Sequence, residues 1–173
     1  MQKNILLENK NKAMENNILE INHFKFGIER FVIDKPKYNL YKSKSGAWKI
    51  ILSFTTSKAI NTSKALEELV FADPYFEAII LLNNNLTLKR GNVTQKQGYD
   101  YENDENSTIF YYFDYQSIEE IKIKLLEVTK DFIIADIQGK TIINGSNGNN
   151  PDAELSIRKT TFMLDKKLNK SFS

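Results

Sequence analysis

Residues 107–137 constrain the fold more than any other stretch, because they join a long series of strand-forming residues with no Pro or Gly. Ile, Phe and Tyr crowd into its first part, and Ile and Phe return in its last part. Both parities of these two runs are apolar or aromatic, a pattern that a strand with one face in water does not show. We therefore predict strands covered on both faces at the centre of a sheet.

Residues 117–128, in the middle of this stretch, fit two different elements. A capping box, Ser-Ile-Glu-Glu, opens the segment, and apolar residues then recur at helical spacing. Against a helix, Ile121, Ile123 and Leu125 alternate with two lysines, and the next polar residues, Thr-Lys-Asp, favour a turn into a further strand. We favour the strand hairpin and keep the helix as the alternative.

The length of 173 residues fits one domain better than two. We divide the chain into a polar N-terminal tail or short helix (1–16), a single β-rich domain (17–165) and a basic C-terminal tail (166–173). The chain has no apolar window long enough to span a bilayer and no signal-peptide core, so we expect a cytoplasmic protein that does not bind membranes.

The remaining strand signals include one clear amphipathic segment, in which Trp48 and the following even-numbered residues to Phe54 are apolar and are expected to face inward. Elsewhere, glycine and proline residues interrupt the alternation of apolar and polar residues. We expect a bend or bulge at Gly27, a strand end at Pro36, a turn around Gly139 and one short helix at 63–71.

Turn signals recur about every ten residues and separate about nine strands, without a regular alternation of strands and helices. This spacing predicts a mostly β fold, an antiparallel β-sandwich or barrel with one or two short helices, and leaves an α+β fold as the alternative.

The residues that usually carry chemistry are scarce. The chain has no Cys and a single His, His23, to which we assign a structural or surface role, and its glycines match no phosphate-binding motif. We therefore predict no catalytic residue, no metal site and no cofactor. A formal net charge of +2 is too small to indicate a nucleic-acid partner.

By elimination, we favour a non-catalytic binding protein that acts through a protein partner. Asn-, Lys- and Ile-rich chains of this size without a catalytic motif are common among small bacterial proteins, and toxin-neutralising immunity proteins are one such class. The alternative is a β-sandwich or barrel that binds a small ligand or carbohydrate through tyrosines. An enzyme that uses only Asp, Glu, Lys or Tyr comes third, and the oligomeric state is left open.

The predicted binding surface combines an acidic loop with the aromatic run that follows it. Core packing is our first interpretation of the aromatic run, and an exposed tyrosine face is the second. If that face exists, carboxylates and tyrosines share one surface, which suits an interface with aromatic anchors and a charged rim. The predicted binding residues are Asp100, Glu102, Asp104, Glu105, Tyr111 and Tyr115.

Overall fold

The computed structural model describes residues 17–42, 46, 48–61, 73–82, 90–96, 108–112, 114–143 and 150–166. Within them, nine strands join into one sheet that is almost entirely antiparallel, which confirms the predicted mostly β, sandwich- or barrel-like fold. The strands are β1 (Ile18–His23), β2 (Gly27–Lys42), β3 (Trp48–Asn61), β4 (Tyr75–Leu82), β5 (Gly91–Lys96), β6 (Ile109–Tyr112), β7 (Asp114–Val128), β8 (Phe132–Ile142) and β9 (Ala153–Leu164).

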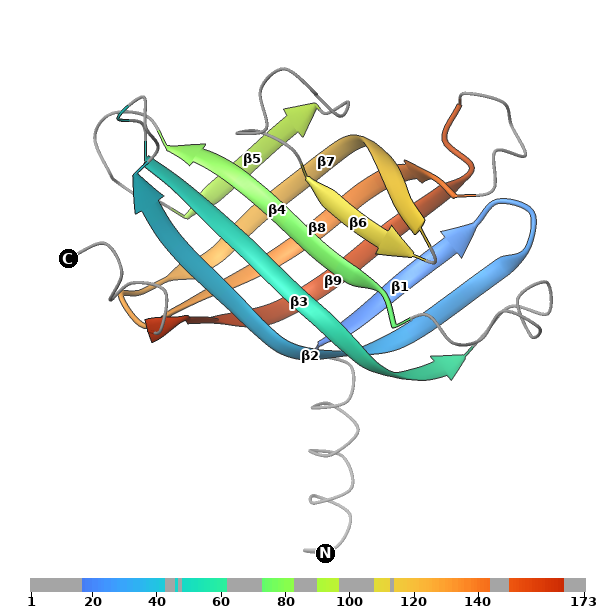
Figure 1. Ribbon diagram of the computed structural model, residues 1–173, viewed down its shortest axis with the longest axis horizontal. Coiled ribbons are helices and arrows are strands. Elements are labelled where there is room, and N and C mark those ends of the chain that lie inside the picture. Colours follow the sequence, from blue (N-terminus) through green and yellow to red (C-terminus); the bar gives the residue numbers. More distant parts are fainter. Residues whose placement is uncertain are drawn as a thin grey trace, which may run out of the picture.

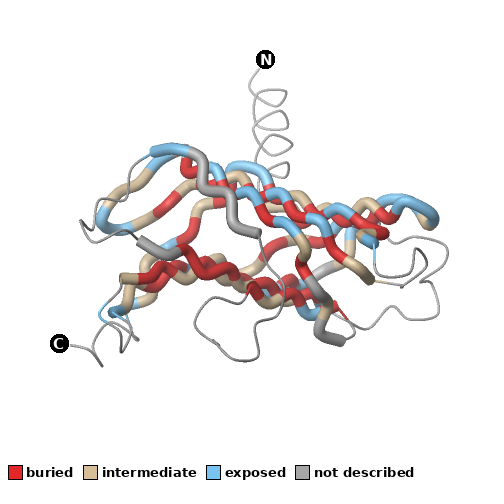
Figure 2. Tube along the Cα trace, turned by 90° about the horizontal axis from the view of Figure 1, so that it is seen from above, coloured by how far each residue is buried: buried red, intermediate tan, exposed pale blue. Residues whose placement is uncertain are grey.

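The sheet folds over on itself into two layers. In Figure 1, β3, β4 and β6 run across β7, β8 and β9, and Figure 2 shows the layers stacked, with buried residues (red) along the strands of both. The strand order is β5-β7-β6-β4-β3-β2-β1-β9-β8, and β8 pairs with β7 in addition. Because β7 also pairs with β5 and β6 over different parts of its length, it links the two ends of the strand order.

The ambiguous segment 117–128 is strand, as we favoured. It belongs to β7, which forms a long hairpin with β8. Thr129 closes the turn: its backbone N–H donates to the Phe132 carbonyl at 2.9 Å, and its Oγ1 accepts from the Phe132 N–H at 2.9 Å. The residues of β7 pair with β5 and β8, and this pairing outweighs the helical spacing of apolar residues in the local sequence.

Gly27 ends a turn, so the predicted bend or bulge within one strand is wrong. Residues 24–26 form a three-residue loop, and Gly27 pairs with His23 across the resulting β1–β2 hairpin. The φ angle of Gly27 is 95°, a left-handed conformation that three-residue hairpin loops often require and that glycine adopts without strain.

The predicted strand end at Pro36 is also wrong, because β2 continues through it to Lys42. The ladder with β3 shifts its register between Asp34 and Lys37, and Lys35 has a φ of 47°. Pro36 therefore lies within a bulge, where its missing N–H removes no ladder hydrogen bond.

The predicted turn around Gly139 is wrong, because Gly139 lies inside β8. A side chain at this position would bring its Cβ within 3.2 Å of the Leu155 Cγ and 3.3 Å of the Glu120 carbonyl oxygen. The glycine thus marks a close approach between neighbouring strands, a common reason for glycine within a sheet.

The core lies between the layers and follows the alternation of the strands. Along β3, Ile50, Leu52 and Phe54 are buried as predicted, whereas Trp48 is only half-buried at the start of the strand. The alternation therefore predicted correctly which residues of β3 face inward, but it overestimated the burial of Trp48 at the strand end.

Several predictions lie outside the described residues. These are the N-terminal segment 1–16, the helix at 63–71 and the basic tail beyond Lys166. Among the residues that are described, no helix combines the length and apolar character needed to cross a bilayer. The predicted domain boundaries stay a prediction.

Candidate functional site

The outward face of β4 and β6 carries two neighbouring tyrosines. Tyr111 lies directly opposite Tyr75 in the β4–β6 ladder and directly opposite Tyr115 in the β6–β7 ladder. Tyr111 is 38% exposed, and Tyr75 is half-buried. Opposite residues in adjacent antiparallel strands lie about 4.5–5.5 Å apart, so the three positions form a continuous cross-strand series, which we call the tyrosine row.

A carboxylate adjoins this row. Glu77 lies two residues after Tyr75 on the same face of β4, and the Tyr75 hydroxyl donates a hydrogen bond of 2.6 Å to its Oε2. The contact fixes the Tyr75 ring against a charged group at the surface. The row thus combines aromatic faces with a hydrogen-bond acceptor.

The aromatic run in β6 divides between the core and the surface. Phe110 and Tyr112 are buried and stack with ring centroids 6.1 Å apart, whereas Tyr111 between them faces outward. The expectation of strands covered on both faces is therefore wrong at Tyr111. The reason is ordinary strand alternation, which places successive side chains on opposite faces even where all of them are aromatic.

The predicted binding residues can now be placed. Tyr111 is exposed, and the backbone of Tyr115 lies beside it in β7. The acidic loop lies outside the described residues, and its four predicted members are Asp100, Glu102, Asp104 and Glu105. Sequence reasoning missed Tyr75 and Glu77, because the β4–β6 pairing that brings them beside Tyr111 joins distant parts of the chain.

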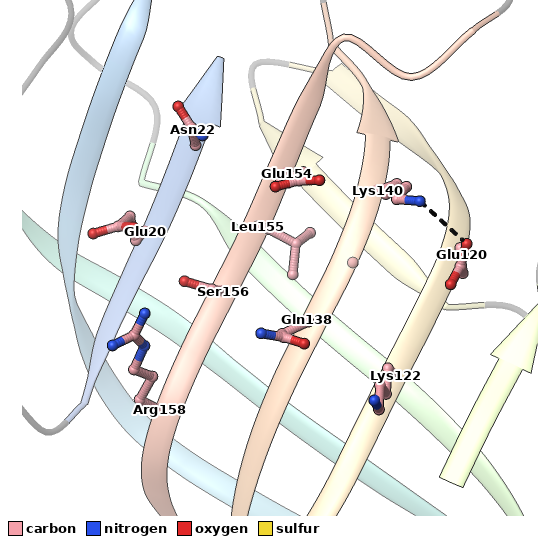
Figure 3. A pocket seen from close by; sticks show the side chains of 11 residues that line it. Glu20, Asn22, Glu120, Lys122, Gln138, Lys140, Glu154, Leu155, Ser156 and Arg158 are labelled. Atoms are coloured by element: carbon pink, nitrogen blue, oxygen red, sulfur yellow. Dashed lines mark ion pairs between the residues drawn. The ribbon is translucent and has the colours of Figure 1, made fainter. Parts of the chain in front are cut away.

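A second surface lies on the other layer, where the outer faces of β1, β9, β8 and β7 form a shallow hollow (Figure 3). We call it the polar groove. Its side chains form cross-strand rows, one of which runs from Lys122 through Gln138 and Ser156 to Glu20. A parallel row runs through Glu120, Lys140 and Glu154.

Ion pairs neutralise parts of this groove. Lys140 and Glu120 lie 3.5 Å apart across the β7–β8 ladder, as Figure 3 shows, and Arg30 holds Glu20 at 2.8 Å across the β1–β2 ladder. Because these pairs are partly exposed, they contribute little to stability. They do, however, decide which charges in the groove are already compensated.

The interior contains a third polar group of residues, the buried cluster of His23, Glu29 and Tyr112. Glu29 Oε2 accepts a hydrogen bond from the Tyr112 hydroxyl and lies 3.2 Å from His23 Nε2. All three side chains are almost completely buried. A buried carboxylate is costly unless it is hydrogen-bonded, so Tyr112 and His23 make Glu29 tolerable in the core.

The cluster also changes the acidity of Tyr112. Burial raises the pKa of Tyr112 above its usual value, and the hydrogen bond and negative charge of Glu29 raise this pKa further. Tyr112 therefore stays protonated and acts as a donor. Glu29 shares the parity of Phe31 and Ile33 along β2, and all three side chains are buried.

Two further observations bear on chemistry. Among the described residues, no group of three His, Cys, Asp or Glu side chains is arranged to hold a metal ion. The buried cluster is closed from solvent by the core around it, so a substrate has no direct access to its three side chains. The two exposed surfaces, the tyrosine row and the polar groove, are therefore the candidate sites.

Comparisons with known proteins add no relative: no family model, no curated protein and no solved structure matches this chain.

Proposed function

We propose that this chain is a non-catalytic binding protein that docks a protein partner through the tyrosine row. The observation that carries the proposal is the position of Tyr111, which is 38% exposed directly opposite Tyr75 on the neighbouring strand. Tyrosine is enriched at the energetically dominant positions of protein interfaces, because it buries a large ring while its hydroxyl keeps a polar partner.

The neighbourhood of the row supports a protein partner. Glu77 adds a charged group beside the rings, and Ser53 and Ile109 flank it in the same cross-strand row. Such a mixture of aromatic centre and polar margin is typical of non-obligate interfaces. Glu77 gives this margin a negative charge, which suits a basic partner.

The test uses capture from lysate of the source cell, followed by binding measurements with the purified candidate. Tyr111→Ala should raise the dissociation constant at least about tenfold, since truncation of a central interface tyrosine costs more than about 1.4 kcal/mol of binding free energy. The matched control is Phe24→Ala, which removes an exposed aromatic ring from the β1–β2 loop. If both variants bind like the wild type, the tyrosine row is not the docking surface.

The finer assignment is a bacterial, cytoplasmic, toxin-neutralising immunity-type protein. Its support is indirect: the small size, the Asn-, Lys- and Ile-rich composition and the absence of a recognisable catalytic motif. The genomic neighbours of the coding sequence test it first. A neighbouring toxin gene whose product is neutralised by co-expression would support the assignment, and a wild-type protein that fails to protect cells from that toxin would contradict it.

One observation favours carbohydrate as the alternative ligand. The hydrogen bond from Tyr75 to Glu77 puts a carboxylate acceptor beside an aromatic ring, and sugars are bound by that combination of ring stacking and hydrogen bonds. A glycan panel separates the two proposals. Binding of one glycan class that is lost in both Tyr75→Ala and Tyr111→Ala would replace the protein partner with a carbohydrate.

A further inference from the structure

The polar groove contains a site at which two cationic side chains and two neutral side chains that can donate hydrogen bonds lie together. Two hollows of about 390 and 450 Å³ lie along the outer face of this layer, and they share four lining residues. The shared residues are Lys122, Gln138, Ser156 and Arg158. We call them the donor site. An ammonium, an amide, a hydroxyl and a guanidinium group all donate hydrogen bonds, and two of them carry positive charge.

Strand pairing holds these side chains together. Lys122 lies opposite Gln138, and Gln138 lies opposite Ser156, so three of them form one row across β7, β8 and β9. Arg158 follows Ser156 by two residues on the same face of β9, and Figure 3 shows it on the opposite side of Gln138 from Lys122. At a strand spacing of about 4.8 Å, the row spans about 10 Å, which long Lys and Arg side chains can close over a small ligand.

The four side chains are not engaged elsewhere in the described part of the chain, where none of them forms an ion pair or a side-chain hydrogen bond. The carboxylates around the site are different. Glu20 is paired with Arg30, Glu120 is paired with Lys140, and Asp136 accepts the backbone N–H of Lys159 at 2.8 Å. Within the described residues, Lys122 and Arg158 are therefore not held by an ion pair, whereas Glu20 and Glu120 already are; Glu154, which also lines the groove, forms no ion pair there either.

We propose that the donor site binds a compact anionic ligand carrying phosphate or pyrophosphate groups. A phosphate group offers several acceptor oxygens and up to two negative charges, which match four neighbouring hydrogen-bonding side chains with two positive charges better than a single carboxylate does. Arg158 supplies the planar fork that contacts two oxygens at once, and Lys122 supplies a point charge from the other side.

The surroundings limit the size of the ligand. Glu20, Glu120 and Glu154 lie toward one end of the groove, and Asp136 lies toward the other. A long polyanion such as a nucleic acid would have to pass over Glu154 and Asp136, which form no ion pair within the described residues, and like charges at close range oppose its binding. The site therefore fits a small phosphorylated molecule, and it is independent of the tyrosine row on the other layer.

The test is a titration of the full-length protein with inorganic pyrophosphate, inorganic phosphate, succinate and a short single-stranded oligonucleotide. We expect saturable binding of pyrophosphate with a dissociation constant near or below about 1 mM at low salt, weakening as ionic strength rises. In an NMR titration, the side-chain amide signals of Gln138 and the Nε–H of Arg158 should shift together. Tighter binding of succinate or of the oligonucleotide than of pyrophosphate would overturn the ligand assignment.

Matched variants identify the residues responsible. The double variant Lys122→Gln with Arg158→Gln should weaken pyrophosphate binding at least about tenfold, and Arg158→Lys should lie between it and the wild type. Lys42→Gln is the control, because Lys42 is an exposed lysine at the end of β2. All of these side chains are at the surface, so folding should be preserved and is checked by the same NMR spectra. Unchanged affinity in the double variant, or no saturable binding to the wild type, would refute the donor site.

Discussion

The two layers of this protein have similar inner faces and very different outer faces. Toward the core, β6 presents Phe110 and Tyr112, and β7 presents Ile121, Ile123 and Leu125. Toward solvent, β4 and β6 present tyrosines, whereas β7, β8 and β9 present lysine, glutamine, serine and arginine. The inward residues of each strand build the same kind of apolar core in both layers. The outward residues, which alternate with them, determine the chemistry of each surface.

This difference separates stability from binding. Inward residues bury apolar area against the opposite layer, and each contributes in proportion to the area that it removes from water. In the two proposals above, outward residues on the tyrosine row and in the polar groove serve recognition. Substitutions on adjacent positions of one strand should therefore have effects of very different size, and the predictions below test that contrast.

The largest expected effect comes from truncating the inner face of β6. Phe110→Ala should lower the free energy of unfolding by about 3–5 kcal/mol, because Phe110 is completely buried and its loss leaves a cavity beside Tyr112. Tyr111→Ala, one residue further along the same strand, should cost less than about 1 kcal/mol. Urea denaturation of both variants measures the contrast, and equal losses would contradict the assignment of the two faces.

A smaller loss is expected in the buried cluster. Tyr112→Phe keeps the ring but removes the donor to Glu29, and hydrogen bonds to charged groups contribute about 1.5–3 kcal/mol. Urea denaturation at neutral pH measures it. A variant as stable as the wild type would show that other contacts of Glu29 suffice to hold the carboxylate in the core.

The same tyrosine predicts a dependence of stability on alkaline pH. The pKa of Tyr112 is raised in the folded protein, and burial together with a coulombic contribution from Asp131 raises the pKa of Tyr38 as well. Below pH about 10 both tyrosines are protonated in the folded and unfolded states, so their contribution is fully present. Above that pH the unfolded state loses protons that the folded state retains, and stability falls as pH rises.

Denaturation at several pH values between 9 and 11 tests this dependence. The slope of the unfolding free energy should be shallower in Tyr112→Phe by up to about 1.4 kcal/mol per pH unit, because one titrating group has been removed. Identical slopes in the variant and the wild type would mean that Tyr112 ionises as readily in the fold as in the unfolded chain.

A further prediction concerns the close approach of strands beneath the polar groove. Gly139→Ala should destabilise the protein by about 1–3 kcal/mol, since the added Cβ would crowd the side chain of Leu155 and the carbonyl oxygen of Glu120. The carbonyl belongs to the backbone and yields little. Thermal denaturation measures the effect, and a stabilised variant would indicate that β8 and β9 can separate locally without loss.

Much of the fold could be predicted from local pattern, and its irregular points could not. Alternation identified β3 and β7 correctly, because the apolar parity is visible within each segment. The continuation of β2 through Pro36 depends on a bulge with a positive φ at Lys35. Such a conformation arises from pairing with β3, which a reading of the local residues does not include.

The candidate surfaces were predictable only in part for the same reason. The sequence predicts Tyr111 as a binding residue, but its neighbour Tyr75 reaches it through a pairing between distant segments. The donor site is assembled from β7, β8 and β9, so its existence depends on strand order. Parity predicts which residues face outward, and it leaves open which outward residues become neighbours.

The smallest expected effect lies in the polar groove itself, at the ion pair between Lys140 and Glu120. Both side chains are about half exposed, at 49% and 50%, and their charged atoms lie 3.5 Å apart. Water and salt screen such a pair, so Lys140→Met should change the free energy of unfolding by no more than about 1 kcal/mol.

The same variant leaves Glu120 uncompensated near the donor site, and pyrophosphate should then bind a few times more weakly at low salt and equally well at high salt. Denaturation and titration of this one variant compare the two properties directly. A large loss of stability with unchanged pyrophosphate binding would reverse the division of roles between the core and the outer face.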